Sequence, residues 1–377
     1  MKLLMNFKSL IRAMKHEGVL NAILIRTVKL LNSKYFVVFL PIYLNVRNLI
    51  FRLSYLKTQR DMFPLAVYDL RANASTFDFC FFMYEAECHF RSKGLPEFDI
   101  LIVPLFSYSD WENVSGHSSV ITEQKKYRRV FNLLLPLAAL YVACRKVILL
   151  DFKSITRELL NSRLNLYPIN YDGFYLGGTD YIKIYDFERR NSFFSGFQAH
   201  SDDLKQVHDW LILNKVNLPF ITITLRTYGF QSKRNSDVQL INNIATYLKQ
   251  EGFDVVLVPD TDDLSGSNSF NVGPCFLPGT FNIFQRNALY ETAYTNFFSS
   301  NGTHALSVLN LNSSFIFSKL VNEYWKIEDL QARGLKYGSQ PWGKGRGVWI
   351  WEEETFESVI AAFEQIRVFK GSPFLTN

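Results

Sequence analysis

An arginine stands where an apolar segment of the sequence gives way to a polar loop. The segment "FITITLR" (220–226) alternates apolar residues with threonine, which is typical of a β-strand, and ends at Arg226. A loop follows that contains Thr227, Lys233 and Arg234. A guanidinium group offers a planar fork of N–H donors that matches a diphosphate, and lysine adds a compact charge. We expect Arg226 to bind an anionic ligand, with Lys233 and Arg234 either helping it or lying on the ordinary surface.

A second polar cluster follows another short apolar segment. "FFSSNG" (297–302) predicts a strand that runs into a turn, and "THALSVLNL" predicts a short helix after it. Backbone N–H groups at a helix start, with Gly302 and the hydroxyl groups of Ser300 and Thr303, can cradle an anion. Ser-Asn-Gly is also a common turn sequence. Asn301 and its neighbours are candidate anion-binding residues mainly because they follow a predicted strand, as Arg226 does.

Aspartates follow the strand predicted at "DVVLVPD" (254–260). Asp260 or Asp262 could accept hydrogen bonds from a ribose or a base edge. An aspartate at this place is as often a cap or a turn residue, so both interpretations stay open.

Further carboxylates precede these elements in the chain. Asp69 ends the strand "LAVYDL", and Asp78 opens the helix that follows. Either could act as a general base on a hydroxyl group, although Asp78 could instead complement the helix dipole. Glu85 and Glu87 lie further along the same helix, where they are catalytic candidates or part of a solvated face.

The elements that must position these residues alternate regularly along the chain. The predicted strands of the first half are 63–70, 98–106 and 146–152. Residues 153–200 have weak periodicity, and a second strand–helix series begins at 220. This alternation predicts an α/β fold with two open, Rossmann-like sheets in tandem, whose ligands bind at the carboxyl ends of strands. The predicted parts are an arm at 1–60, domains at 61–200 and 201–350, and a last helix at 351–377 that returns to the first domain.

The positive charge of this 377-residue chain is concentrated at its N-terminus. Residues 1–60 hold 11 lysines and arginines against one acidic residue, whereas the rest has a net charge of −4. Nucleic-acid binding by the body is therefore not expected. The arm has apolar residues at helical spacing but no uninterrupted apolar core, which favours a helix lying on a membrane surface over a signal peptide or a membrane span. A solvated hairpin that packs on the body is the alternative.

Metal and cofactor signatures are not found in the sequence. The four cysteines form no C-x-x-C pair, and there is no Walker A, G-x-G-x-x-G, H-E-x-x-H or G-x-S-x-G sequence. We expect reduced thiols, no bound metal and no cofactor.

Several segments together resemble a known family. Two tandem Rossmann-like domains, with the phosphate-binding set in the second, resemble GT-B-type glycosyltransferases. Residues 63–366 are similar to a group of bacterial proteins associated with surface-polysaccharide and O-antigen synthesis. The segments that carry this similarity are "AVYDLRANASTFDF", "YRRVFNLLLPLAALY", "ITITLRTYGFQSKRNS", "VVLVPD", "ALYETAYTNFFSSNGTHALSVLN" and "WIWEEETFESVIAAFEQI". The second half also resembles the nucleotide-binding half of fucosyltransferases, but Thr224 stands where that motif commonly has histidine, and Gly302-Thr303 where Gly-Pro is expected.

The resemblance implies a metal-independent glycosyltransferase that moves a sugar from a nucleotide-sugar donor to a lipid-linked glycan acceptor in surface-polysaccharide synthesis. The second domain would hold the donor, and the first domain would hold the acceptor, with Asp78 or Asp69 as the base if the reaction inverts. The arm would keep the enzyme peripheral on the cytoplasmic face of the cell membrane. A nucleotide-sugar epimerase and a non-catalytic scaffold subunit of a polysaccharide assembly complex are the alternatives.

Overall fold

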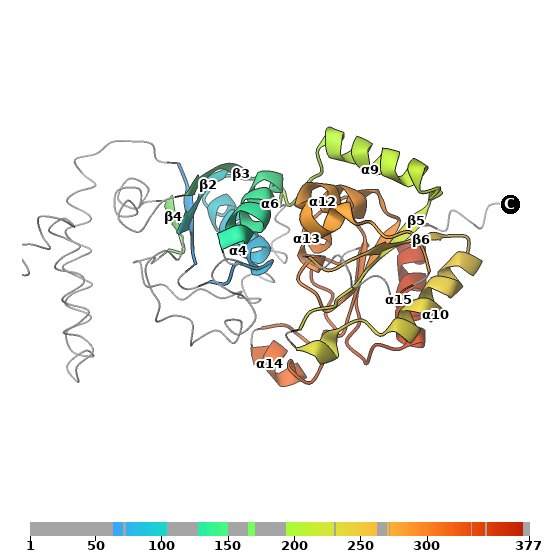
Figure 1. Cartoon of the computed structure of the whole chain (residues 1–377). Coiled ribbons are helices and arrows are strands. Elements are labelled where there is room, and N and C mark those ends of the chain that lie inside the picture. The colour runs from blue at the N-terminus through green and yellow to red at the C-terminus, as the bar shows by residue number, and fades with distance from the viewer. Residues whose placement is uncertain are drawn as a thin grey trace, which may run out of the picture. The chain divides into compact units, whose positions relative to one another are not determined.

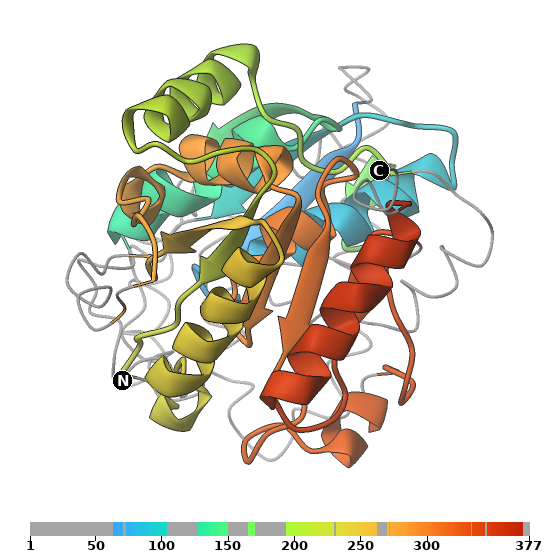
Figure 2. The same cartoon turned by 90° about the vertical axis from the view of Figure 1, so that its right-hand side faces the viewer.

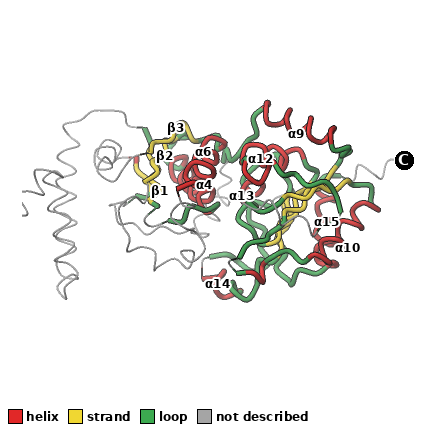
Figure 3. Tube along the Cα trace, in the orientation of Figure 1, coloured by secondary structure: helices red, strands yellow, loops and turns green. Residues whose placement is uncertain are grey.

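The strands of the protein form two parallel sheets (Figure 1 and Figure 3). The computed structural model describes residues 63–70, 73–103, 127–149, 165–169, 194–229, 231–261, 270, 272–332, 334–343 and 345–371. One sheet has four strands and the other has five, and every neighbouring pair runs parallel. The predicted α/β class with two successive parallel sheets is thus confirmed.

The predicted basic arm at 1–60 lies outside the described residues, as does Asp262. Within the described ranges, no helix has both the length and the apolar character needed to cross a bilayer.

The first sheet has the strand order β3-β2-β1-β4. Its strands are β1 (Leu65–Asp69), β2 (Phe98–Val103), β3 (Cys144–Leu149) and β4 (Leu166–Tyr167). Helix α4 (Asp78–Arg91) connects β1 to β2. A π-helical turn (Val130–Leu134) and helix α6 (Leu135–Leu140) precede β3.

The π-helical turn explains how a proline is accommodated in the helical segment before β3. Pro136 lies in the first turn of α6, directly after the π-helical turn. Proline has no N–H and its ring clashes with a carbonyl one turn back, so a wider turn at this place relieves both problems. The helix ends at Leu140, because Tyr141 is extended and β3 starts at Cys144.

The second sheet has the strand order β6-β5-β7-β8-β9. Its strands are β5 (Phe220–Thr224), β6 (Asp254–Val258), β7 (Thr295–Ser299), β8 (Phe315–Ser318) and β9 (Gly347–Trp349). Its helices are α9 (Ser201–Leu213), α10 (Val238–Gln250), α11 (Pro278–Phe281), α12 (Ile283–Thr292), α13 (His304–Val308), α14 (Ile327–Ala332) and α15 (Phe356–Phe369).

Helices cover both faces of the second sheet. Helices α10 and α15 lie side by side on one face, as Figure 2 shows. Alternate strand residues such as Ile221 and Val255 belong to the same apolar core as Phe363 of α15 there. The other face contributes Phe220 and Phe298 to a second core with α9, α12 and α13. The last helix was predicted to return to the first domain. The buried residues of α15 face the second sheet instead, and the predicted division into domains stays a prediction.

One apolar core continues from the first sheet to the second. It includes residues of α4 and α6 together with residues of α12 and α13. The ring of Phe81 on α4 lies 5.5 Å from that of Trp342 and 5.8 Å from that of His304, measured between centroids. Residues 64–149 and 166–377 accordingly belong to one compact unit, and the domain boundary near residue 200 stays a prediction.

Among the described helices and strands, four were not predicted from the sequence: β4, α11, α14 and β9. Strand β9 lies within residues 334–355, a segment rich in glycine and tryptophan. Gly347 is needed in β9 because it pairs directly with Phe315 of β8, and a side chain at 347 would meet the phenyl ring.

Gly347→Ala is expected to destabilise the fold by about 1–3 kcal/mol, because the new methyl group would overlap the ring of Phe315 in a packed sheet. Urea denaturation followed by circular dichroism measures this. Gly229→Ala is the matched control, since no described atom lies within 4 Å of its added methyl group. Equal stability of the two variants would contradict the packing argument.

Candidate functional site

The predicted ligand-binding residues of the second sheet gather at one edge. The register of the parallel strands aligns the last residues of β5 and β6 with Phe298, the next-to-last residue of β7. Arg226, Asp260 and Ser300 follow these three strands within two residues. The strand-end positions inferred from the sequence therefore come together in space.

These strand ends form one side of a cavity of about 370 Å³. The other side comes from the first half of the chain, through residues 76–78, Phe81 of α4, Arg129 and Leu133. The predicted site residues that line the cavity are Asp78, Arg226, Arg234, Asp260, Ser300, Asn301, Gly302 and Thr303. The cavity thus brings a first-half carboxylate to the same space as the basic groups of the second half.

Arg226 is buried, with only 4% of its surface exposed, and neighbouring oxygen atoms fix its position. Its Nη1 donates to the carbonyl oxygen of Gln231 at 3.1 Å and to the side-chain oxygen of Asn235. The guanidinium carbon lies 5.8 Å from the ring centroid of Tyr228. Burial lowers the pKa of Arg226, and the nearby carboxylate of Asp260 opposes this shift.

Arg234 lies beside Arg226 and binds three oxygen atoms. Its Nη2 and Nε donate to the carbonyl and hydroxyl oxygens of Ser300 at 2.6 and 3.1 Å, and its Nη1 donates to the side chain of Gln231 at 2.5 Å. Burial and then repulsion by Arg226 lower its pKa to about 10, while Asp78 opposes the shift. Both arginines remain cations at neutral pH, and a bound anion would relieve their repulsion.

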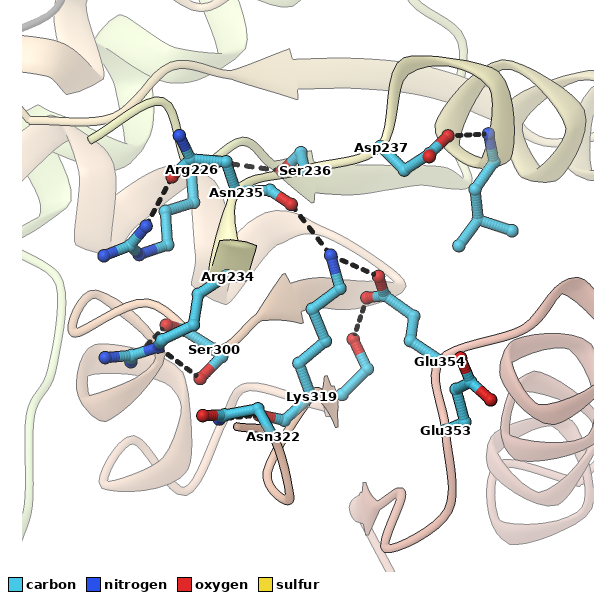
Figure 4. A network of polar contacts seen from close by, with 12 residues as sticks. Arg226, Arg234, Asn235, Ser236, Asp237, Ser300, Lys319, Asn322, Glu353 and Glu354 are labelled. Atoms are coloured by element: carbon cyan, nitrogen blue, oxygen red, sulfur yellow. Dashed lines mark hydrogen bonds and ion pairs between the residues drawn. The ribbon is translucent and has the colours of Figure 1, made fainter. Parts of the chain in front are cut away.

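The loop that carries these arginines is held from its far side as well (Figure 4). Lys319 donates to the carbonyl oxygen of Asn235 at 2.7 Å, and its ammonium group lies 3.0 Å from the carboxylate of Glu354. Ser318 donates to the same carboxylate. Asn235 thus links Arg226, through its side chain, to an ion pair at the start of the last helix.

Asp260 is an acceptor for the backbone around it. Its carboxylate accepts from the N–H groups of Thr227 at 3.3 Å and Thr261 at 2.8 Å. Burial raises the pKa of Asp260, and Arg286 is the largest opposing influence. Arg286 is completely buried and donates to the carbonyl oxygens of Gly279 and Pro259 at 2.5 and 2.6 Å. Asp260 therefore balances buried positive charge, and its expected contact with a ribose or base stays a prediction.

The turn after β7 contains a buried donor without a partner. Asn301 is 5% exposed, and its oxygen accepts from the hydroxyl of Thr303 at 2.7 Å. Its Nδ2 finds no hydrogen-bond partner within the described structure. A Cβ at Gly302 would come within 3.1 Å of the ring of Phe77, which explains the glycine. Helix α13 has only five residues, so side chains rather than a helix dipole give this turn its polarity.

His304, which the sequence-based candidates omit, also lines this cavity. Its Nδ1 lies 2.5 Å from the carbonyl oxygen of Asn301. Its ring lies 4.3 Å from that of Phe317, between centroids. Burial lowers the pKa of His304 to about 4, and Arg234 adds to this effect. The only sequence signal was its place directly after the Ser-Asn-Gly-Thr turn.

Asp78 is the carboxylate of the first half that reaches the cavity. It is exposed at the first turn of α4, and its Oδ2 accepts from the hydroxyl of Thr76 at 2.8 Å. Asp69 is buried and does not line the cavity. Glu85 and Glu87 are buried rather than on a solvated face, and they accept from the hydroxyl groups of Tyr167 and Tyr141, each at 2.7 Å.

Two predicted donor-binding residues lie away from the cavity lining. Lys233 is exposed and pairs with Glu323 at 2.5 Å. Thr227 contributes its backbone N–H to Asp260. Arg129, by contrast, lines the cavity from the first half but was not a candidate, because nothing in "YRRVFN" distinguishes it from a surface arginine.

No protein-family model matches this sequence. No curated protein matches it either. The structure is similar to a family 9 glycosyl transferase of Veillonella parvula, with 10% identity, 82% of this chain and 99% of that chain covered, and a TM-score of 0.49. It is also similar to ADP-heptose LPS heptosyltransferase II of E. coli, with 8% identity, coverage of 81% and 99%, and a TM-score of 0.47. A third similar structure is E. coli heptosyltransferase WaaC with ADP-2-deoxy-2-fluoro heptose, at 8% identity, 80% and 98% coverage, and a TM-score of 0.41. Each of these TM-scores lies below 0.5.

The state of His304 predicts how stability depends on pH. The folded protein protonates His304 only near pH 4, whereas the unfolded chain does so near 6.5. The stability that neutral His304 contributes is therefore complete above about pH 6.5 and is lost as the pH falls toward 4, by at most about 3 kcal/mol. Urea unfolding at pH 7 and pH 4.5 should show a steeper loss for the wild type than for His304→Asn, which cannot be protonated.

His208→Asn is the control for this measurement, because His208 is exposed on α9. Its pH dependence is expected to follow the wild type. Parallel curves for the wild type and His304→Asn would contradict the neutral, buried state of His304.

Proposed function

We propose that this protein is a GT-B-type glycosyltransferase that transfers a sugar from a nucleotide-sugar donor. The observation that carries this proposal is a pair of arginines, the buried Arg226 and the partly buried Arg234, which share one cavity with Asp78 of the first half. A diphosphate matches the arginines in charge and geometry, and a carboxylate across the cavity suits activation of an acceptor hydroxyl.

The chemistry of the bond that breaks fits this arrangement. When the glycosidic bond to the donor is cleaved, negative charge develops on the leaving diphosphate. Guanidinium groups positioned beforehand stabilise that charge without reorganising. Arg226 and Arg234 are held by oxygen atoms of Gln231, Asn235 and Ser300, so their orientation is set before a ligand binds. We propose that these cations do the work that a metal ion does elsewhere, and that catalysis is metal-independent.

The acceptor is proposed to be a lipid-linked glycan in bacterial surface-polysaccharide synthesis. The concentration of positive charge in residues 1–60 supports this, since anionic lipid attracts such a segment. The enzyme would then work at the cytoplasmic face of the cell membrane, where its donor is soluble and its acceptor is anchored. Asp78 would act as the base if the configuration at the sugar inverts.

Arg226→Ala is expected to weaken binding of a nucleoside diphosphate by about 10- to 100-fold, because a charge-assisted hydrogen bond contributes about 1.5–3 kcal/mol. Isothermal titration calorimetry with UDP, ADP and GDP measures this. Arg226→Lys keeps the charge but not the fork, and an intermediate affinity is expected for it.

Lys249→Ala, which removes an exposed charge on α10, is the control and should bind like the wild type. If Arg226→Ala bound nucleoside diphosphate as tightly as the wild type, the site assignment would be wrong. Absence of binding to any nucleotide or nucleotide sugar by the wild type would favour a scaffold subunit.

Asp78→Asn is expected to lower the turnover number for release of nucleoside diphosphate from the donor by about 100- to 10,000-fold. Donor affinity should be unchanged or slightly higher, because the carboxylate repels a diphosphate. Asp69→Asn tests the other candidate and is expected to lose less activity, since Asp69 does not line the cavity. A greater loss for Asp69→Asn would reverse this assignment.

A further inference from the structure

The hydrogen bond of His304 sets the tautomer of its imidazole ring. A carbonyl oxygen accepts but cannot donate, so the ring nitrogen 2.5 Å from the carbonyl of Asn301 must carry the proton. Nδ1 is therefore the protonated nitrogen. In a neutral ring Nε2 then presents a lone pair, and no described residue makes a hydrogen bond to it.

The surroundings of the ring keep it neutral. It lies tilted against the ring of Phe317 and approaches Phe81 of α4 and Trp349 of β9. The charged groups that share the cavity are Arg129, Arg226, Arg234, Asp78 and Asp260. Arg234 opposes protonation of His304, and burial is the larger cause of its low pKa, about 4. The cavity therefore contains a hydrogen-bond acceptor beside two strong cationic donors.

A lone pair of this kind discriminates between the parts of a nucleotide sugar. It repels an anionic phosphate oxygen, which also has only lone pairs, and it attracts a hydroxyl group. The position of the ring points to the transferred sugar rather than to the ribose. His304 contacts α4, the helix that begins with Asp78. During transfer, the sugar must lie between the diphosphate and the base.

We propose that Nε2 of His304 accepts a hydrogen bond from a hydroxyl group of the donor sugar and so determines specificity for that sugar. This inference rests on the proposed function and adds a division of labour to it. The arginines bind the diphosphate, and His304 recognises the group that is transferred. A sugar without a hydroxyl at the contacted position leaves the lone pair unmatched and binds more weakly.

The test compares each nucleoside diphosphate with its own sugar derivative. UDP, ADP, GDP and the corresponding nucleotide hexoses are titrated calorimetrically into the wild type and into His304→Asn. Asparagine keeps a donor for the carbonyl of Asn301 but removes the acceptor at the Nε2 position. The affinity of His304→Asn for the nucleotide sugar is expected to fall about 3- to 10-fold, the value of one neutral hydrogen bond, with less than a twofold change for the nucleoside diphosphate.

His304→Gln provides the second variant, because its amide oxygen can reach the position of Nε2. It is expected to bind the nucleotide sugar more tightly than His304→Asn, and circular dichroism checks that both variants fold. Equal losses for the diphosphate and the sugar derivative, or no loss for either, would overturn the inference. Failure of the wild type to bind any of these ligands would instead overturn the proposed function.

Proton uptake gives an independent readout. Titrations of the diphosphate at pH 7, in buffers of different ionisation enthalpy, count the protons taken up on binding. The wild type and His304→Asn are expected to take up equal numbers, because His304 stays neutral. One extra proton in the wild type would mean that an imidazolium binds the phosphate, which would overturn the inference.

Discussion

Two like charges held close together in a partly buried space are the constraint around which this site is built. Arg226 and Arg234 repel each other, yet the side chains and carbonyl groups that bind them directly are mostly neutral. Gln231, Asn235 and Ser300 fix the direction of each guanidinium group without cancelling its charge. Three arginines and two aspartates line the cavity, and this excess of positive charge favours an anion.

The continuous apolar core brings the remaining chemistry to these charges. Phe77 packs on Gly302, and Phe81 approaches His304, so the start of α4 lies against the turn after β7. These are contacts between residues more than two hundred positions apart in the chain. They explain why Asp78, at the beginning of α4, lines the same cavity as groups from the second sheet.

Much of this site follows from one rule about parallel sheets, and the exceptions have local causes. Arg226 was predictable because strands of a parallel sheet present their carboxyl ends at one edge. Lys233 and Arg234 are neighbours in a single 3₁₀ turn, where Lys233 faces Glu323 and Arg234 faces Ser300. Their positions in the sequence do not show which of the two faces the cavity. His304 was missed because its role depends on distant rings and one backbone carbonyl. Strand β9 was missed because three residues are too few to show a period.

The hydrogen bond between Lys319 and the carbonyl of Asn235 has a consequence for the entropy of ligand binding. A loop tied at both its side chain and its backbone loses its conformational entropy when the protein folds. Little further conformational entropy is then lost when a ligand binds. Anion binding at Arg226 should then have an entropy set mainly by the release of water and counterions.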